Sequence, residues 1–252
     1  MMDGKRDTDR PAPGDLWSAL ALLTRLPVPD HAPRGASAGW AWPIVGAVVG
    51  GIAALVISVA VFIGIPAGVA AALALATTAM VTGALHEDGL ADTADGFFGG
   101  RDVDRRLAIM KDSHIGSFGT LALILVTLAR WSALAVLCTT GGAAVALIAA
   151  GALSRVPMLV LMAALPNARK SGLSQSVGQP GRGVILMAIV VAVVLGLFLT
   201  GWVTLWIALA LAALTVGLGA LARRKIGGQT GDVLGASQQL AEVLCLALLA
   251  AA

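Results

Sequence analysis

Three aspartates with helical spacing stand out in a short polar stretch of an otherwise apolar chain. The stretch covers residues 86–100, and Asp88, Asp92 and Asp95 follow one another at intervals i, i+4 and i+7. If the stretch is helical and continues the apolar segment before it, the three carboxylates share one face. Like charges at these spacings repel, so a counter-ion is expected. Hard oxygen ligands suit Mg²⁺ or Mn²⁺ better than zinc, and we therefore predict a divalent metal site rather than a solvated acidic loop.

Basic and small residues follow the aspartates directly. Arg105 and Lys111 are placed to bind phosphate oxygens. Ser113, Gly116 and Gly119 precede or open the next apolar segment, where free backbone N–H groups would face an anion. Two plainer interpretations stay open, namely that Ser113 caps this helix and that the glycines let helices pack closely.

A second polar stretch, residues 227–236, opens the last apolar segment. A glycine-rich loop that runs into a helix N-terminus is a general anion site, and Asp232 would either cap the helix or add a fourth metal carboxylate. Glu242 lies deeper in the same segment, where an unpaired charge is costly. We expect Glu242 to pair with Arg130 or Arg155, or to stay protonated.

The composition places these residues in a membrane protein. Of the 252 residues, 58% are apolar and 12% are charged, against about 45–50% and about 25% in soluble domains. So few charged groups cannot cover a soluble globule, and so apolar a chain would not stay disordered. We expect an all-α, polytopic membrane protein with about seven transmembrane helices.

The predicted spans are the seven segments long enough to cross a bilayer: 43–63, 67–85, 118–138, 143–164, 184–200, 203–222 and 234–252. The apolar segment around residues 16–26 is too short to span and predicts an N-terminal interfacial helix. We expect residues 1–252 to form one integral membrane domain, with a flexible tail over residues 1–15.

The charges fall mainly on one side of these spans. Fifteen of the seventeen Lys and Arg residues and thirteen of the fourteen Asp and Glu residues lie there, while the three short opposite loops have no Lys or Arg. The positive-inside rule makes that side cytoplasmic, with the N-terminus inside and the C-terminus outside. We therefore expect a multi-pass protein of the cell (inner) membrane with a cytoplasmic active face. The net charge of +3 is too small to suggest a nucleic-acid partner.

Small residues predict close helix packing. Cys138 and Cys245 both lie in apolar runs, which favours packing residues over a disulfide or a cysteine metal cluster. The 31 glycines let membrane helices approach closely. A homo-oligomer is compatible with this composition.

A metal-binding carboxylate group, nearby cations and a lipid-facing body together indicate phosphoryl or phosphodiester transfer on a membrane-associated substrate. A transporter is the alternative of another class. It would predict paired broken helices and internal repetition, and the sequence has no convincing repeat.

Four sequence blocks stand out along the chain: TRLPVP (24–29), HEDGLADTADG (86–96), MKDSHIGSFG (110–119) and GQTGDVLGA (228–236). In sequence, order and spacing they resemble the blocks of the cobalamin synthase (adenosylcobinamide-GDP ribazoletransferase) family. The resemblance therefore covers nearly the whole chain. Residues 166–183, with Arg169, Lys170 and Arg182, are the part least like the family.

The resemblance implies the last assembly of the nucleotide loop of vitamin B12. Adenosylcobinamide-GDP and α-ribazole, or α-ribazole 5'-phosphate, would give adenosylcobalamin, or its 5'-phosphate, and GMP, with Mg²⁺ required. Asp88, Asp92 and Asp95 would then be the metal ligands, and catalysis would fall to them and Lys111. The residues implied to bind substrate are His86, Arg105, Ser113, Gln229 and Asp232.

A CDP-alcohol phosphotransferase, which acts on phospholipids, is the alternative among membrane enzymes with several metal-binding aspartates. Its pattern, D-x2-D-G-x2-A-R followed by G-x3-D-x3-D, is not met here, because the Gly-x2-Ala-Arg after the first acids is missing.

Overall fold

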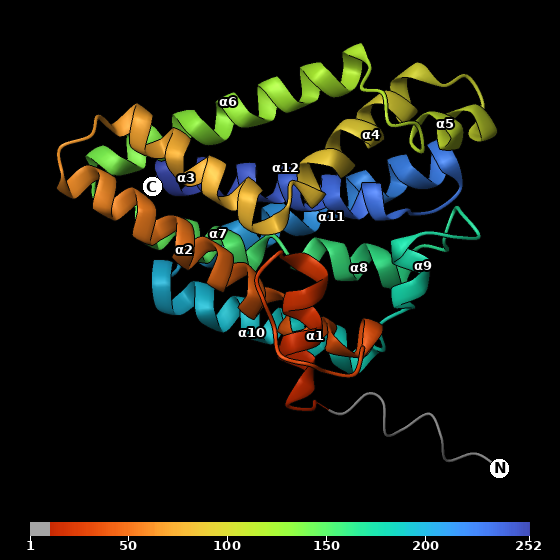
Figure 1. The fold of residues 1–252 in the computed structure, drawn as a ribbon, viewed down its shortest axis with the longest axis horizontal. Coiled ribbons are helices and arrows are strands. Elements are labelled where there is room, and N and C mark those ends of the chain that lie inside the picture. The colour runs from red at the N-terminus through yellow and green to blue at the C-terminus, as the bar shows by residue number, and fades with distance from the viewer. Residues whose placement is uncertain (1–10) are drawn as a thin grey trace.

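The computed structural model describes residues 11–252 as a helical bundle (Figure 1). The first elements are α1 (Gly14–Leu23), a 3-10 helix η1 (Gly35–Ala41), α2 (Trp42–Phe62), α3 (Ala67–Thr82), α4 (Leu85–Gly99) and α5 (Val103–Ile109). The others are α6 (Ser117–Thr139), α7 (Ala143–Leu153), α8 (Val156–Ala164), α9 (Leu173–Val177), α10 (Arg182–Thr200), α11 (Val203–Ile226) and α12 (Gly231–Ala250). In the described part of the chain the extended pairing is limited to one parallel bridge between Asn167 and Gln229.

The predicted all-α membrane fold is confirmed. Within residues 11–252, six helical segments are long and apolar enough to cross a membrane, and α3 with α4 makes a seventh if that bent pair is counted as one span. The segment 143–164, predicted as one span, consists of α7 and α8 in sequence. The short helix predicted at residues 16–26 is α1, which begins earlier, at Gly14.

The polar stretch at residues 86–100 is helical, but it does not continue the helix before it. Helix α4 meets α3 at 90°, because Gly83 and Ala84 both adopt left-handed backbone angles, with φ of 64° and 55°. A side chain at Gly83 would also meet Arg25, since its Cβ would lie 2.5 Å from Arg25 Nε. The bend directs α4 onto α12.

The N-terminal segment is tied to the bundle through Asp15. This fully buried carboxylate accepts hydrogen bonds from Arg34 Nε at 2.7 Å and from Trp40 Nε1 at 2.8 Å. Burial alone would raise the pKa of Asp15, but these donors lower it. Of the tail predicted over residues 1–15, residues 1–10 lie outside the described residues, and Gly14 and Asp15 already belong to α1.

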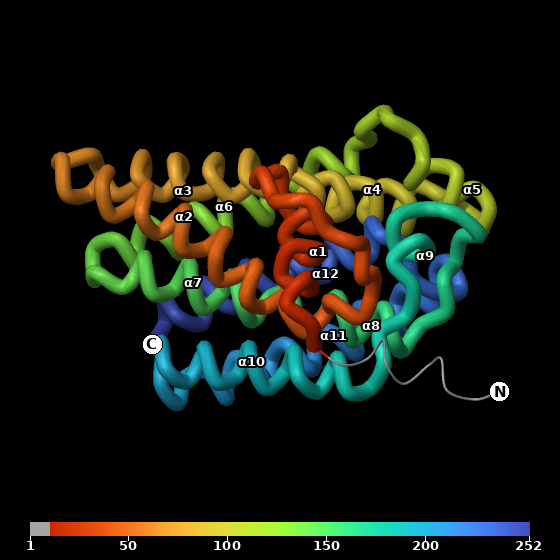
Figure 2. Tube along the Cα trace, turned by 60° about the horizontal axis from the view of Figure 1, so that its bottom comes forward, coloured from red at the N-terminus to blue at the C-terminus, as the bar shows by residue number. Residues whose placement is uncertain are grey.

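The long helices run side by side along the bundle. In Figures 1 and 2 the turns α2–α3, α6–α7 and α10–α11 lie at one end, and α5 and α9 lie at the other. Helices α2 and α7 pack closest through Gly46 and Gly151, where a Cβ on either residue would overlap the carbonyl oxygen of the other. This is the close approach that small residues permit between membrane helices.

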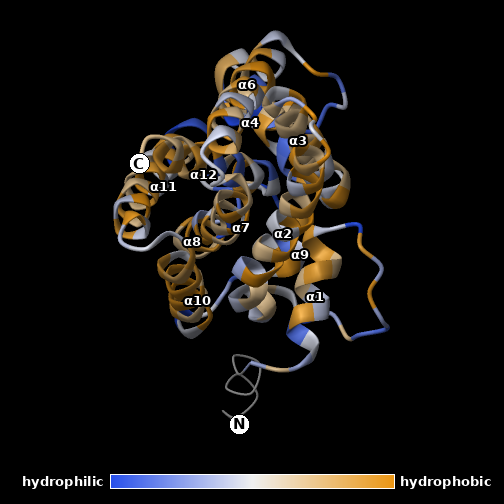
Figure 3. Cartoon of the chain, turned by 90° about the vertical axis from the view of Figure 1, so that its left-hand side faces the viewer, coloured by the Kyte–Doolittle hydropathy of each residue, from blue (hydrophilic) through white to orange (hydrophobic). Residues whose placement is uncertain are grey.

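Apolar side chains cover the outside of the bundle as well as filling its core. Figure 3, which looks along the bundle, shows hydrophilic stretches among α3, α7 and α12 and mainly apolar ribbon around them. Exposed large apolar side chains include Leu55, Phe198 and Val216. Cys245 is buried and Cys138 partly buried, both as free thiols, as expected for packing residues.

Candidate active site

The contact between α4 and α12 brings the aspartates of α4 next to Asp232. A Cβ on Gly89 of α4 would lie 2.8 Å from the Asp232 carbonyl oxygen, and one on Gly235 would lie 3.3 Å from the Cα of His86. Glycines at these two positions let the two helices touch backbone to backbone. The second and fourth family-like blocks therefore face each other.

We call Asp88, Asp92 and Asp232 the acidic cluster. The negative charges of Asp232 and Asp88 act on Asp92, as does that of Asp95, while the positive charge of Arg169 opposes them. Asp92 is half-buried and Asp88 is exposed. The acidic cluster thus has more negative than positive charge around it, as expected for a site that receives a cation.

Asp95 has a different position from the other two aspartates of α4. Its carboxylate accepts the backbone N–H groups of Gly116 at 2.7 Å and Gly119 at 2.9 Å, which are orphan donors at the start of α6. Side chains at these glycines would overlap the Asp95 carboxylate. The N–H groups expected to face an anion therefore face a carboxylate of the protein itself, and Asp95, not Ser113, caps α6. A metal-ligand role for Asp95 stays a prediction.

The donor chemistry of the acidic cluster fits Mg²⁺, because its carboxylates are hard oxygen ligands with an excess of negative charge. In residues 11–252, however, no three His, Cys, Asp or Glu side chains are grouped closely enough to hold an ion as they stand.

Three residues predicted to catalyse or to bind substrate lie in the exposed segment between α4 and α6. Arg105, Lys111 and Ser113 are all exposed and do not line the cavity described below. The Arg105 backbone N–H donates to Asp102, which caps α5. Their roles toward substrate stay predictions.

A neighbouring pair fixes the same loop. His114 Nδ1 lies 2.7 Å from Asp112 Oδ1. This hydrogen bond lowers the pKa of Asp112 and raises the pKa of His114. Both side chains are exposed, so the contact is a local one.

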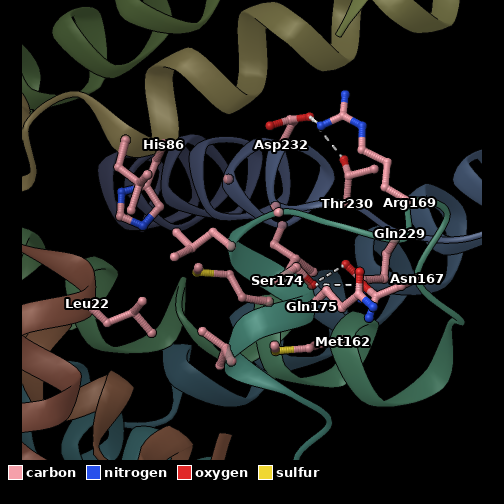
Figure 4. A pocket seen from close by; sticks show the side chains of 18 of the residues that line it. Leu22, His86, Met162, Asn167, Arg169, Ser174, Gln175, Gln229, Thr230 and Asp232 are labelled. Carbon is pink, nitrogen blue, oxygen red and sulfur yellow. Dashed lines mark hydrogen bonds and ion pairs between the residues drawn. The ribbon is translucent and has the colours of Figure 1, made fainter. Parts of the chain in front are cut away.

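A cavity of about 140 Å³ opens beside the acidic cluster (Figure 4). His86, Asp88 and Asp232 line one side of it. Apolar side chains line another part: Leu22, Leu23, Trp42, Met158 and Met162. Further parts of the wall come from residues 167–177 and from residues 229–235 at the start of α12. The cavity combines an apolar base with charged and amide groups, the usual make-up of a small-molecule site.

Gln229, predicted to bind substrate, is the residue that holds this wall. Its amide accepts from Ser174 Oγ at 2.8 Å and donates to Asn167 Oδ1 at 2.6 Å. Gln229 is buried, and both ends of its side-chain amide are engaged within the protein. Its position makes it a support of the cavity wall.

Residues 166–177 are the part of the site that sequence reasoning missed. They have no helical periodicity and no family-like block, and their contact with Gln229 joins positions about sixty residues apart. The one usable signal was a group of polar residues, Asn167 to Ser176, between two apolar segments.

His86 lies at the inner side of the cavity (Figure 4). The side chain is almost fully buried, and its Nε2 atom has no hydrogen-bond partner in the described residues. A buried polar atom without a partner is rare in folded proteins and needs an explanation, which a ligand in the cavity would provide. This position is compatible with the predicted substrate-binding role.

We call a second polar group the buried network. Its members are Glu87, Arg130, Arg155, Gln238, Gln239 and Glu242. Glu242 forms ion pairs with both Arg130 and Arg155, so the pairing predicted for it is confirmed. Gln238 and Gln239 supply further hydrogen bonds, and the charges of the network balance.

Comparisons with known proteins show the family of the chain. The family model of cobalamin-5-phosphate synthase matches residues 15–250. The chain is 46% identical over 250 residues to the adenosylcobinamide-GDP ribazoletransferase of Bradyrhizobium diazoefficiens, covering 97% of this chain and 96% of the relative. Proteins of the same name from Rhizobium meliloti and Brucella ovis are 43% and 42% identical, over 94% and 92% of this chain and 96% and 95% of theirs. No solved structure matches the chain. On the family match and these identities, the chain belongs to the cobalamin-5-phosphate synthase family.

Proposed function

We propose that this protein joins adenosylcobinamide-GDP to α-ribazole, or to its 5'-phosphate, and releases GMP. The observation that carries the proposal is the meeting of Asp88 and Asp92 on α4 with Asp232 on α12 beside one cavity. The relatives that span nearly the whole chain are named for this transfer. No feature favours a CDP-alcohol phosphotransferase.

The reaction is a phosphodiester transfer. A ribazole hydroxyl oxygen forms a bond to the phosphorus next to cobinamide, and the bond from that phosphorus to the GMP oxygen breaks. The hydroxyl proton needs an acceptor, and Asp92 is proposed for this, because its carboxylate is half-buried within the acidic cluster. In such transfers the protein mainly positions the groups and stabilises charge.

Mg²⁺ is proposed as the cofactor. Asp88 and Asp92 would hold it together with Asp232, and Asp95 would join them only by leaving the α6 terminus. When bound, the ion supplies positive charge to the phosphate oxygens. Lys111 and Arg105 lie on the exposed side of α4, where they would reach the outer part of a large substrate.

The active face is proposed to be cytoplasmic. Helices α5 and α9 lie at one end of the bundle (Figure 2). Arg105 and Arg106 belong to α5, and positive charge is retained inside. A reporter fused after Ala252 is expected to report the outer side, and one fused at the N-terminus the inner side.

The test is GMP release by the full chain in lipid vesicles. Release is expected only when adenosylcobinamide-GDP and ribazole are both present. A protein that instead releases CMP from a CDP-alcohol, or that releases no GMP with both substrates and Mg²⁺, contradicts the proposal.

A further inference from the structure

The connection between α8 and α9 brings an arginine to the acidic cluster. Arg169 Nη1 lies 3.0 Å from Asp232 Oδ2, and the Arg169 charge also acts on Asp92. Of the described residues that line the cavity, Arg169 is the only lysine or arginine. Figure 4 shows it at the opposite side of the cavity from His86.

The guanidinium of Arg169 is only partly engaged. Besides Asp232, it donates from Nη2 to the Leu107 carbonyl at 3.3 Å. Its Nε atom is buried and has no acceptor in the described residues. A guanidinium has five N–H donors, so donors remain for another acceptor.

The backbone that bears Arg169 is held in place. Gln229 N donates to the Pro166 carbonyl at 2.9 Å, and Ala168 N donates to the Gln229 carbonyl at 2.8 Å. A Cβ on Gly228 would overlap the Pro166 carbonyl oxygen, so the two segments touch directly. These contacts fix the residue before Arg169 against the start of α12.

The other cations near α4 are less suited to an anion in the cavity. Arg106 donates to three backbone carbonyls, those of Gly100, Arg101 and Lys225, and so is used for structure. Arg105 and Lys111 are exposed and lie outside the cavity lining. Arg169 is the cation with both a cavity position and unused donors.

We propose that Arg169 binds a phosphate group of the nucleotide-bearing substrate, exchanging its ion pair with Asp232 for one with the phosphate. The planar guanidinium matches two phosphate oxygens, and release of Asp232 frees that carboxylate for the cation expected in the acidic cluster. This inference rests on the proposed function and adds to it a substrate-binding residue from the segment least like the family.

The test compares the binding of GMP, the leaving group, to full-length variants in detergent. R169Q is expected to weaken the Kd for GMP at least tenfold, whereas K170Q, an exposed neighbour, is expected to stay within twofold. R169K retains the charge and is expected to recover most of the binding. Catalytic measurements should show a raised KM for adenosylcobinamide-GDP and an unchanged KM for ribazole.

A double variant separates phosphate binding from an effect through Asp232. If Arg169 acts on the phosphate, R169Q weakens GMP binding also in a D232N background. If D232N and the double variant R169Q/D232N bind GMP equally, the inference is overturned. It is also overturned if R169K loses as much GMP binding as R169Q. Should R169Q fail to assemble, a tenfold loss in R169K overturns it and a loss below threefold supports it.

Wild-type turnover is measured first, so that the two proposals fail in different ways. A wild-type protein without GMP release contradicts the proposed function. Normal wild-type turnover with unchanged GMP binding in R169Q contradicts only the assignment of Arg169.

Discussion

The buried network and the acidic cluster both take carboxylates from α4 and α12, and they differ in their balance of charge. In the buried network Glu242 contacts Arg130 and Arg155, and Gln238 also donates to Glu242 Oε2. In the acidic cluster the charge of Arg169 acts on Asp92 and Asp232, while the carboxylates of Asp88 and Asp232 both act on Asp92. Polar groups inside a membrane protein are costly unless they are paired. The paired group therefore indicates structure, and the unbalanced group indicates a ligand.

Removing Glu242 is expected to have the largest effect on folding. Glu242→Ala leaves two buried arginines without their shared carboxylate, and loss of one partner of a buried pair costs about 3–5 kcal/mol. Thermal unfolding in detergent measures this. Val216→Ala, on an exposed face of α11, is the control and is expected to unfold like the wild type. Equal stability of the two variants would show that the buried network is not structural.

Asp92→Asn is expected to act on catalysis instead. It removes a charge from the acidic cluster without changing the shape of the side chain, and turnover should fall at least about 100-fold, or about 2.7 kcal/mol in activation free energy. Asp104→Asn, an exposed acid on α5, serves as the control. An Asp92→Asn protein that keeps its activity but loses stability would show that Asp92 serves the fold, and not catalysis.

Gly119→Ala tests the contact between the start of α6 and Asp95 of α4. A Cβ at this position would overlap the Asp95 carboxylate and lie 2.9 Å from the Ala91 carbonyl oxygen, so we expect a loss of about 1–3 kcal/mol in stability. Gly217→Ala, where nothing lies within 4 Å, is the matched control. Unfolding midpoints of both variants, measured together, distinguish a tight helix contact from a tolerant one.

Gln229→Ala is expected to have the smallest effect. It removes hydrogen bonds to Ser174 and Asn167, each worth about 1 kcal/mol. Residues 166–178 should become easier to cleave by protease, and turnover should fall a few-fold. Gln179→Ala, at an exposed position nearby, is expected to change neither. Undiminished protection from protease in Gln229→Ala would mean that the wall is held by its backbone contacts alone.

The spans could be predicted from sequence because the constraint on them is local. Twenty apolar residues in a row suffice to mark a span, and α6, predicted at 118–138, extends over Ser117–Thr139. The 90° turn before α4 could not be predicted in this way, since Ala84 is not a residue that favours a left-handed backbone. The turn forms because tertiary contacts with α12 and Arg25 hold it.

The candidate site was predictable to the extent that its residues lie in motifs. Asp88, Asp92 and Asp232 belong to family-like blocks, and the structure brings them together. The G-x-x-G spacing of Gly116 and Gly119 indicated an anion, but not that the anion is the Asp95 carboxylate. Arg169 reaches Asp232 only through the folded chain, and no local pattern encodes that contact.

The most direct test of the account is GMP release by wild-type protein in vesicles, measured while Mg²⁺ is removed by a chelator and then restored. The account predicts that release stops without Mg²⁺, returns in a saturable way when Mg²⁺ is restored, and stays absent throughout in Asp92→Asn protein that is folded. Undiminished release in excess chelator, or wild-type rates from Asp92→Asn, would contradict the assignment of the acidic cluster as the catalytic site.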